Sequence, residues 1–360
     1  MIKYLGSKKK LLPQIEEAFR SCVDPNDCSE PPVVADLFSG AGNVAAHAKA
    51  CGYRVYANDM QMYATTIARA YLRRSRGASW DCDFLIELMQ EAAEKGDYSG
   101  EEPYFVKAFC GPGDRLPAKF FRTENGWKAH HMREVLRSTR TPMTDAQKAM
   151  GLTMLMEALD RVDNTTGVQM AYLKKWCRRS QNDLALRSLR IPDGPVGEAF
   201  TGRAEDFFEK WGSKLRPVDI AYLDPPYNQH NYRGNYHIWE TLVRWDNPER
   251  YGKANKRVDV KDAHRKSDFN SKRKAIAAME KLVASIRARF IVVSFSNEGF
   301  IPRHEMLRIL STRGEVSVQG HGHERYIGHA IGGHNDKGER VSSSTHSRNV
   351  EHLYICKVRE

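Results

Sequence analysis

The sequence predicts an α/β fold in which a mostly helical insertion interrupts an open, largely parallel sheet. Residues 33–59 show the alternation of strand, glycine turn, helix and strand that builds parallel sheets. Residues 218–223 form a second short apolar run, as expected for a buried strand. Between these regions, residues 61–96 and 144–162 have helical periodicity. A chain of 360 residues is long enough for two domains, or for one large domain carrying such an insertion.

The first strand–helix–strand unit contains a turn that is typical of nucleotide-binding proteins. Its strand, turn, helix and second strand are expected at residues 33–38, 39–43, 44–51 and 54–59. The spacing Gly40-x-Gly42 allows a tight turn and a close approach of the backbone to a ligand. Asp59 ends the second strand, where a carboxylate can accept both hydroxyls of a ribose. A glycine turn that binds no ligand is the alternative.

Residues 80–195 are interpreted as the insertion, and residues 1–79 and 196–360 as the two parts of the α/β domain. A loop-rich stretch over residues 97–127 precedes helices expected at residues 130–140, 144–162 and 169–179. Thr144 is a good N-cap for the second of these helices.

Strand and helix alternate again after the insertion. Strands are expected at residues 197–200, 218–223, 290–295, 316–318 and 351–358, and helices at 274–287 and 303–311. A hairpin is expected within residues 320–338, with its turn at 335–338.

The most informative residues are Asp224, Pro225, Pro226 and Tyr227, directly after the strand at 218–223. The prolines must end the strand, because each lacks the N–H donor that the sheet requires. A carboxylate, free carbonyls and an aromatic ring are thereby placed at the carboxyl end of a strand, where open α/β sheets bind ligands. This set can stack on a planar base while two acceptors bind its exocyclic amine. A strand end followed by a turn is the alternative, since short motifs also occur by chance.

Composition and cysteine spacing indicate a cytoplasmic protein without a membrane span. The chain is 41% hydrophobic but has no apolar run of about 18 residues, and its N-terminus lacks the apolar core of a signal peptide. Seven cysteines without a C-x-x-C pair favour reduced thiols over disulfides or a zinc site. His321, His323, His329 and His334 match no zinc signature, so no metal ligands are predicted.

The net charge of +11 is concentrated in two segments. Residues 115–190 hold 15 Lys+Arg against 7 Asp+Glu, and residues 230–275 hold 12 against 6. Basic segments on a nearly neutral scaffold are typical of proteins that bind a phosphate backbone. A solvated basic surface without a partner is the alternative.

With these motifs in order, the chain resembles the Dam-like (α-group) adenine-N6 DNA methyltransferases. The matches to motifs X, I, II, III and IV lie at residues 3–8, 36–42, 58–59, 205–207 and 224–227. Further matches lie at residues 164–167, 171–174, 235–237, 240–241 and 295–299. The family often has Trp where this chain has Tyr4, and Gly is common where it has Ser7. The resemblance implies a Rossmann-like class I methyltransferase sheet, with residues 80–195 for target recognition and 230–275 as a DNA-contacting segment.

The resemblance also implies S-adenosyl-L-methionine as methyl donor and double-stranded DNA as substrate. It assigns catalysis to residues 224–227 and cofactor binding to Tyr4, Ser7, Lys8, Asp36, Phe38, Gly40, Gly42, Asp59, Asp206 and Phe207. In this assignment Asp36 faces the amino-acid end of the cofactor, and Asp206 accepts from its adenine amine. Two alternatives without a ligand remain: Lys8 can belong to a solvated basic end, and Asp206 can cap a helix.

DNA phosphates are expected to meet basic residues in both segments, namely Lys174, Lys175, Arg178, Arg179, Arg233 and Lys272. The family implies a monomer, and a cognate restriction endonuclease is a possible partner. Three alternatives stay open: an RNA adenine-N6 methyltransferase, a DNA cytosine-N4 methyltransferase and an inactive DNA-binding relative. A nicotinamide-dependent oxidoreductase shares the glycine turn but has no use for residues 224–227.

Overall fold

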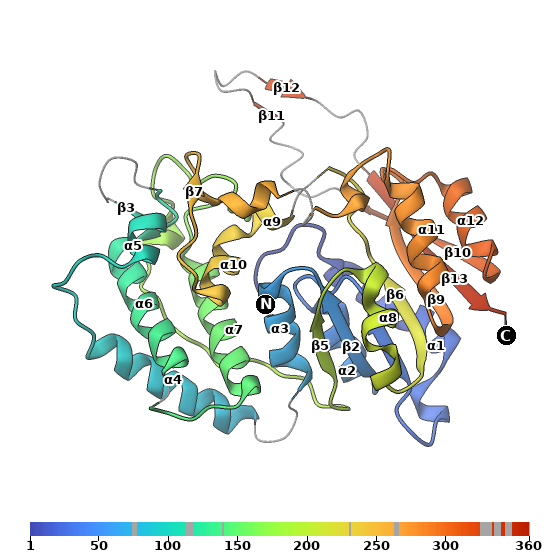
Figure 1. Ribbon diagram of the computed structural model, residues 1–360, viewed down its shortest axis with the longest axis horizontal. Helices are drawn as coiled ribbons and strands as arrows, with labels where there is room; N and C mark the ends of the chain where they lie inside the picture. The colour runs from blue at the N-terminus through green and yellow to red at the C-terminus, as the bar shows by residue number, and fades with distance from the viewer. Residues whose placement is uncertain are drawn as a thin grey trace.

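The computed structural model describes residues 1–73, 78–111, 118–138, 140–229, 232–262, 266–324, 333–334, 340–342 and 348–359. Its centre is a seven-stranded sheet with the order β10-β13-β9-β6-β1-β2-β5 (Figure 1). The strands are β1 Val33–Asp36, β2 Arg54–Asp59, β5 Glu198–Thr201, β6 Val218–Leu223, β9 Ala288–Ser296, β10 Gly314–Glu324 and β13 Arg348–Val358. The five adjacent strands β9, β6, β1, β2 and β5 are parallel, and β13 runs antiparallel to both β9 and β10. The predicted α/β fold with a Rossmann-like sheet is confirmed.

Helices cover both faces of the sheet, which explains why its central strands are apolar on both sides. One face carries α1 (Leu12–Cys22), α2 (Asn43–Ala50) and α3 (Met62–Leu72), and the other carries α8 (Phe207–Trp211), α11 (Ala275–Ser285) and α12 (Arg303–Ser311). Alternate residues of β1 serve the two faces: Val34 packs in the core with α1 and α2, and Ala35 packs in the core with α11.

The strand order reverses between β1 and β6. From β1 the chain continues to β2 and later β5 on one side, whereas β6 and β9 lie on the other. Such a switch point leaves a crevice beyond the carboxyl ends of the two central strands. The glycine turn after β1 and residues 224–227 after β6 are therefore brought to the same place.

A helical layer lies beside the sheet, on the left in Figure 1. Its helices are α4 Ala78–Glu94, α5 Tyr104–Phe109, α6 Thr123–Arg137, α7 Asp145–Val162, α9 Tyr232–Asn235 and α10 His237–Arg244. Two short strand pairs accompany them, β3 Cys110–Gly111 with β4 Phe121–Arg122 and β7 Arg250–Tyr251 with β8 Lys256–Arg257. Buried side chains such as Met150, Met154 and Trp239 join these helices to α3 in one core. Thr144 forms a capping box with Gln147 at the start of α7, so its predicted role is confirmed.

Two expectations in this layer are wrong. Residues 169–179, all of them described, form no helix; they run irregularly into a 3₁₀ turn at Arg178–Gln181. Asn164 gives the reason, because its side chain accepts from Cys177 N–H at 3.0 Å and donates to the Leu173 carbonyl at 3.0 Å. These local bonds replace the helical ones. The stretch at residues 97–127, expected to be loop-rich, contains α5, the short strands β3 and β4, and the start of α6.

The C-terminal part differs from expectation in length. The strand expected at 316–318 is the longer β10, which pairs with β13 along its whole length. Of the expected hairpin, the short strands β11 (Gly333–His334) and β12 (Arg340–Ser342) pair antiparallel, whereas its turn at 335–338 and His329 lie outside the described residues.

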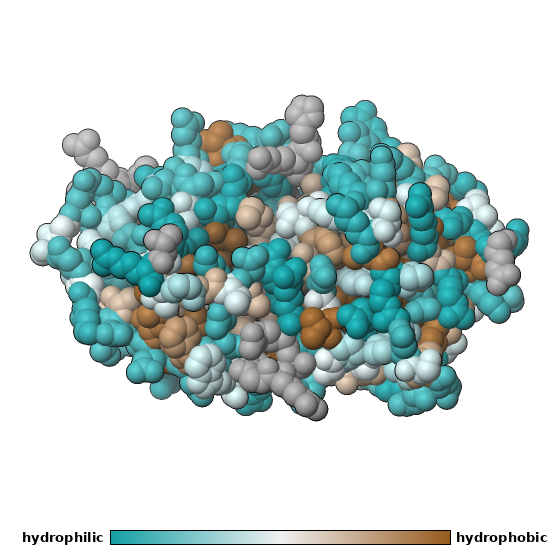
Figure 2. Space-filling model, turned by 60° about the horizontal axis from the view of Figure 1, so that its bottom comes forward, coloured by the Kyte–Doolittle hydropathy of each residue, from teal (hydrophilic) through white to brown (hydrophobic). Residues whose placement is uncertain are grey.

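The molecular surface is mainly hydrophilic on the face shown in Figure 2, where hydrophobic residues form small, separate patches. Within the described residues, no helix combines the length and apolar character needed to cross a bilayer.

Candidate active site

The glycine turn after β1 has the left-handed backbone that its sequence predicts. Gly40 and Gly42 have φ angles of 50° and 78°, which favour glycine. A Cβ atom on Gly40 would lie 2.8 Å from the ring of Tyr4, so this close packing requires glycine as well. The turn is closed by the N–H of Gly42, which donates to the Ser39 carbonyl at 2.7 Å. It therefore presents its backbone closely to the crevice.

Asp36, the last residue of β1, is a buried acid with incomplete hydrogen bonding. Its side chain is 1% exposed, and its Oδ1 accepts only a long bond of 3.4 Å from Phe38 N–H. Within the described part of the chain, Asp36 Oδ2 and Ser39 Oγ have no hydrogen-bond partner. Burial, together with the nearby charge of Asp224, raises the pKa of Asp36 to about 8. A cationic ligand group beside Asp36 would remove this cost.

Asp59 holds the glycine turn from the next strand. Its Oδ2 accepts from Gly40 N–H at 3.0 Å, and its Oδ1 accepts from Gln61 N–H at 2.9 Å. Burial raises the pKa of Asp59 to about 6 in spite of these bonds. The two oxygens keep further lone pairs, so the residue can also accept from ligand hydroxyls.

Asp224 follows β6 and belongs to a buried cluster of charges. Lys8, in the 3₁₀ turn η1 (Lys8–Leu11), places its Nζ 2.9 Å from Asp224 Oδ1 and 2.8 Å from Glu351 Oε1. Burial raises the pKa of Asp224 to about 6, and the charge of Lys8 opposes this rise. Burial alone would lower the pKa of Lys8, but Asp224 and Glu351 keep it well above its usual value. The side chain of Lys8 is therefore charged and no part of a solvated end.

Residues 224–227 form one wall of a cavity at the carboxyl ends of the strands, which we call the carboxyl-end cavity. The rest of its lining consists of Tyr4, Leu5, Gly6, Leu37, Phe38, Asp59, Met60, Gln61, Gly202, Ala204, Tyr232, Arg233, Ser267 and Asn270. The carbonyl of Tyr227 accepts from Phe300 N–H at 2.9 Å, and its ring meets the ring of Phe295 edge-on at 6.4 Å between centroids. The segment is thus anchored through its backbone while its side chains line the cavity. Ser7, Lys8, Asp36, Gly40 and Asn43 line an adjoining recess that shares Tyr4, Phe38 and Asp224 with it.

Tyr4 belongs to a stack of three tyrosines beside this cavity. Its ring centroid lies 4.8 Å from that of Tyr236 and 5.4 Å from that of Tyr232, with nearly parallel planes. The hydroxyl of Tyr236 accepts from Leu5 N–H at 2.6 Å, and that of Tyr232 donates to the Leu5 carbonyl at 3.2 Å. These contacts fix the N-terminal segment against α9 and α10. Tyr232 was not singled out from the sequence, although its spacing of four from Tyr236 is a helical signal.

Three residues predicted to bind the cofactor, Gly42, Asp206 and Phe207, line neither the cavity nor its adjoining recess. Asp206 stands at the N-cap position of α8 without a side-chain capping bond, and it pairs with Lys210 at 3.2 Å. Phe207 is buried in the core against Phe200 and Phe208. Their contacts with a cofactor stay predictions that the cavity does not support.

The six predicted DNA contacts differ in their surroundings. Lys174, Lys175, Arg178 and Lys272 are exposed. Arg179 lies 2.7 Å from Asp163 Oδ1 and thereby ties the irregular segment to the end of α7. Arg233 is buried, with its Nη2 3.9 Å from Asp259 Oδ1. The four exposed residues can approach a phosphate without breaking an internal pair seen in the described structure.

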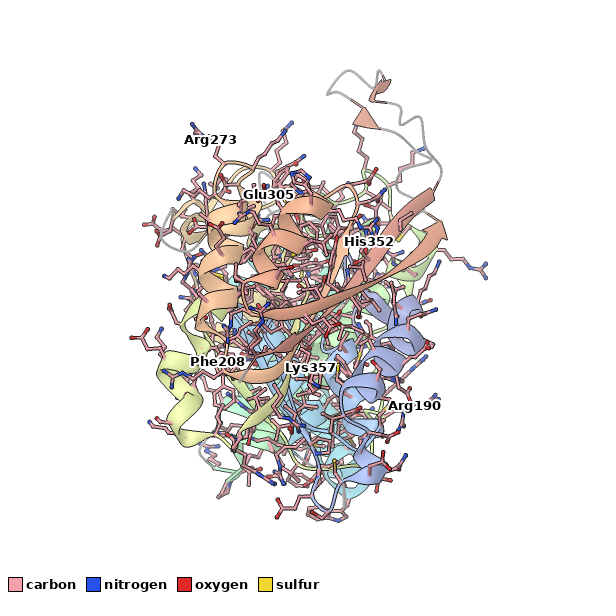
Figure 3. All side chains as sticks on the ribbon, turned by 90° about the vertical axis from the view of Figure 1, so that its right-hand side faces the viewer. Arg190, Phe208, Arg273, Glu305, His352 and Lys357 are labelled. Atoms are coloured by element: carbon pink, nitrogen blue, oxygen red, sulfur yellow. The ribbon has the colours of Figure 1, made fainter. Side chains whose placement is uncertain are left out.

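Glu351 and Ser294 join the cluster around Asp224 and were missed in the sequence. Ser294 Oγ donates to Glu351 Oε1 at 2.7 Å. Glu351 precedes His352 in β13, and Figure 3 labels His352 and Lys357 at separate points along this strand. A single acid in an apolar strand has no spacing signal, and nothing in the sequence shows which strand will lie beside it.

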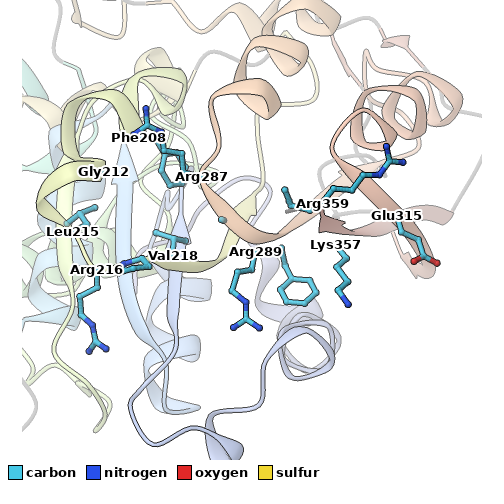
Figure 4. Close-up of a pocket in the computed structure, with 14 residues that line it drawn as sticks. Phe208, Gly212, Leu215, Arg216, Val218, Arg287, Arg289, Glu315, Lys357 and Arg359 are labelled. Atoms are coloured by element: carbon cyan, nitrogen blue, oxygen red, sulfur yellow. The ribbon is translucent and has the colours of Figure 1, made fainter.

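A larger cavity, the amino-end groove, lies at the opposite end of the same strands (Figure 4). It is lined by Phe208, Gly212, residues 215–218, residues 287–290, Glu315 and residues 357–359. Apart from Phe208 and Gly212, in α8 and the turn after it, these residues lie at or beside the starts of β6, β9 and β10 and at the end of β13. This lining contains none of the residues predicted for the site, although Asp206 and Phe207 directly precede its Phe208 in the sequence.

One group outside the cavity resembles a metal site. Glu16, His47 and Cys51 bring potential ligand atoms within 4.8 Å of one another. His47 Nε2 lies 2.8 Å from Glu16 Oε2, and Arg20 Nε lies 3.1 Å from Glu16 Oε1. A hydrogen bond between His47 of α2 and Glu16 of α1 is sufficient to explain this arrangement.

Comparison with known proteins finds a consistent set of relatives. A family model described as D12 class N6 adenine-specific DNA methyltransferase matches residues 4–300. The modification methylase StsI of Streptococcus sanguinis is 32% identical over 328 residues, covering 89% of this chain and 47% of that protein. The type II methyltransferase M.FokI of Planomicrobium okeanokoites is 28% identical, covering 87% and 47%. M.NlaIII of Neisseria lactamica is 26% identical and is covered to 99%, as is this chain. The chain therefore spans about half the length of StsI and M.FokI.

Proposed function

Because the chain belongs to the family of D12 class N6 adenine-specific DNA methyltransferases, we propose that it methylates the N6 amine of adenine at specific sites in duplex DNA. The methyl donor is S-adenosyl-L-methionine, and the target base is flipped out of the helix into the carboxyl-end cavity. The relatives are named modification methylases and type II methyltransferases, so a restriction endonuclease with the same recognition site is the expected counterpart.

The residues around the glycine turn suit this donor. Asp36 offers a buried carboxyl group with an open oxygen for a cationic amino group, and Asp59 offers acceptors for ribose hydroxyls. Gly40 allows close approach of the backbone, since even a Cβ atom there would meet Tyr4. When bound, S-adenosylmethionine supplies an electrophilic methyl group attached to a positively charged sulfur.

Asp224 and the carbonyl of Pro225 are the acceptors for the target amine. The lone pair of this amine is delocalised into the ring, so hydrogen bonds from its two N–H groups to these oxygens favour a pyramidal nitrogen with an available lone pair. Transfer would form the nitrogen–carbon bond while the sulfur–carbon bond of the donor breaks to leave a neutral thioether, and the alkylated amine would pass its extra proton through Asp224 to water. Positioning and fixed dipoles provide most of the rate enhancement. Asp224 need not be a strong base, because the alkylated amine is acidic.

Tyr227 stabilises the flipped base by stacking. Extruding a base from the helix costs a few kcal/mol, and stacking on an aromatic ring recovers about 1–3 kcal/mol. Its backbone is anchored by Phe300, so the ring stands in place before the base arrives. Phosphate contacts from Lys174, Lys175, Arg178 and Lys272 position the duplex without reading its sequence.

The observation that carries this proposal is the meeting of Asp36, Gly40 and Asp224 at one crevice, with residues 224–227 as its wall. Mass spectrometry of nucleosides, after incubation with S-adenosylmethionine and methylation-free duplex DNA, tests it. N6-methyladenine is expected with the wild-type protein and absent with Asp224→Ala. N4-methylcytosine alone, or methylation of RNA but not of DNA, contradicts the proposed substrate.

A further inference from the structure

Glu351 is a buried acid to which the reaction described above gives no role. The residue is 3% exposed; on β9 it lies opposite Ser296, and Leu353 is the next residue of β13 on the same face of the sheet. It lies beyond residues 4–300, the part of the chain that the family model matches. A buried carboxylate is tolerated only when it is paired and hydrogen-bonded. Lys8 and Ser294 satisfy that requirement, but its place beside Asp224 calls for a functional reason.

Lys8 is shared between two carboxylates. Its Nζ lies 2.9 Å from Asp224 Oδ1 and 2.8 Å from Glu351 Oε1, so the one ammonium group faces two negative charges. If Lys8 faced Asp224 alone, the pair would be neutral, and Asp224 would be a weaker acceptor for an amine. A lone ammonium group would also oppose the positive charge that develops on the amine nitrogen during transfer.

The two oxygens of Asp224 have different surroundings. Lys8 holds Oδ1, and the described residues give Oδ2 no hydrogen bond. The side chain keeps 19% exposure and lines the carboxyl-end cavity, so its second oxygen is open to a substrate. Ser294, which is fully buried on β9, donates to Glu351 and fixes the far side of the arrangement.

We propose that Glu351, held by Ser294, is a positioning residue for methyl transfer. It draws Lys8 to one side of Asp224 and offsets its charge, so Asp224 keeps a charged oxygen free for the target amine. This role rests on the proposed function.

The charged and titratable groups facing Asp224 determine the pH test. They are Lys8 from η1, Glu351 from β13, Tyr222 from β6, Asp36 from β1, and Tyr227 and Tyr232 from the cavity wall. Glu351 is among those that raise the pKa of Asp224. Removing its charge therefore lowers this pKa and moves the acid limb of the activity profile to lower pH.

The test is Glu351→Gln, which removes the charge and keeps the shape. We expect kcat to fall about 10- to 100-fold, KM for DNA and for S-adenosylmethionine to stay within about threefold, and the acid limb of kcat to move to lower pH. Glu315→Gln, the same change at an exposed position on β10, is the matched control and keeps wild-type kinetics. Ser294→Ala should change kcat and the acid limb in the same direction by a smaller factor.

Three outcomes overturn the role of Glu351: a kcat within twofold of wild type, a loss confined to KM, or an unmoved acid limb. If circular dichroism shows that Glu351→Gln does not fold, Ser294→Ala decides by the same criteria. Wild-type protein that methylates no adenine contradicts the proposed function and this role with it. Active wild-type protein beside an unaffected Glu351→Gln variant contradicts this role alone.

Discussion

The two ends of the central sheet line their cavities in opposite ways. At the carboxyl end, burial raises the pKa of Asp36 to about 8 and those of Asp59 and Asp224 to about 6. At the amino end, the larger groove is lined by exposed cations such as Arg287 and Lys357, whose charges are solvated. The comparison teaches why the proposed site is placed at the carboxyl end: its buried acids are held away from their ordinary ionisation, although its cavity is the smaller of the two.

Topology explains the difference between the ends. The reversal of strand order between β1 and β6 opens a crevice only at their carboxyl ends. Two turns with constrained backbones meet there, one containing Gly40 and the other containing Pro225 and Pro226. At the amino end, the chain enters β6 and β9 through exposed residues that need no partner to remain charged.

The largest expected effect comes from Asp224→Asn at the carboxyl end. The amide keeps the shape of the carboxylate but removes the charged acceptor, so kcat should fall on the order of 10²–10³-fold or more. The affinity for S-adenosylmethionine, measured by isothermal titration calorimetry, should stay within about threefold. Near-native turnover in single-turnover assays would show that the carboxyl-end cavity is not the catalytic centre.

Tyr227→Ala sharpens the comparison through the flipped base. Loss of about 1–3 kcal/mol of stacking corresponds to a weakening of base capture by about 5- to 150-fold. The measurement is the fluorescence of 2-aminopurine at the target position, which rises when the base leaves the stack. Signals that match wild type at equal DNA occupancy would argue that the ring of Tyr227 does not hold the base.

Asp36→Asn tests how much the burial of an ionisable acid destabilises the folded protein. The pKa of Asp36 is raised from an ordinary value of about 3.9 to about 8, so its contribution to stability is complete at low pH and is lost as pH rises between these values. The amide does not titrate. The melting temperature of Asp36→Asn minus that of wild type should therefore be higher at pH 8 than at pH 5, by about 2 °C or more.

The exposed Asp183→Asn variant is the control for this comparison and should show no such pH-dependent difference. An equal difference at both pH values for Asp36→Asn would mean that Asp36 is ionised in the folded protein. Asp36→Asn should also lose the rise in melting temperature that S-adenosylmethionine gives to the wild-type protein.

The smallest effect is expected when basic residues outside the carboxyl-end cavity are replaced by neutral ones. The double variant Lys174→Gln/Lys175→Gln should reduce the slope of log K for DNA against log[salt] by about one unit for each phosphate that the protein no longer neutralises. Arg287→Gln/Lys357→Gln removes the same number of charges from the amino-end groove and should leave the slope unchanged. Equal changes in the two double variants would place DNA at both ends of the sheet.

The sequence predicted those parts of the molecule in which local chemistry decides the structure. The glycines at 40 and 42, the prolines at 225 and 226 and the cap at Thr144 each impose a backbone geometry, and each lies where it was expected. The helix expected at 169–179 failed because Asn164 offers that segment competing hydrogen bonds, which periodicity does not show.

The site was predicted less completely because part of it depends on long-range pairing. Lys8 was expected near the cofactor, and it does line the recess beside Gly40, but its contact with Asp224 requires the N-terminal segment to fold across β6. Glu351 enters through β13, which pairs with β9 from the far end of the sequence. Phe207 shows the reverse case, since a motif residue expected at the cofactor is buried in the core.

The most direct test of the account is a crystal structure with S-adenosylhomocysteine. We predict that the ligand lies across the turn at Gly40, with its amino group within hydrogen-bond distance of Asp36 and its sulfur facing Asp224. A ligand in the amino-end groove, or one that leaves Asp36 without a partner, would contradict the assignment of the carboxyl-end cavity.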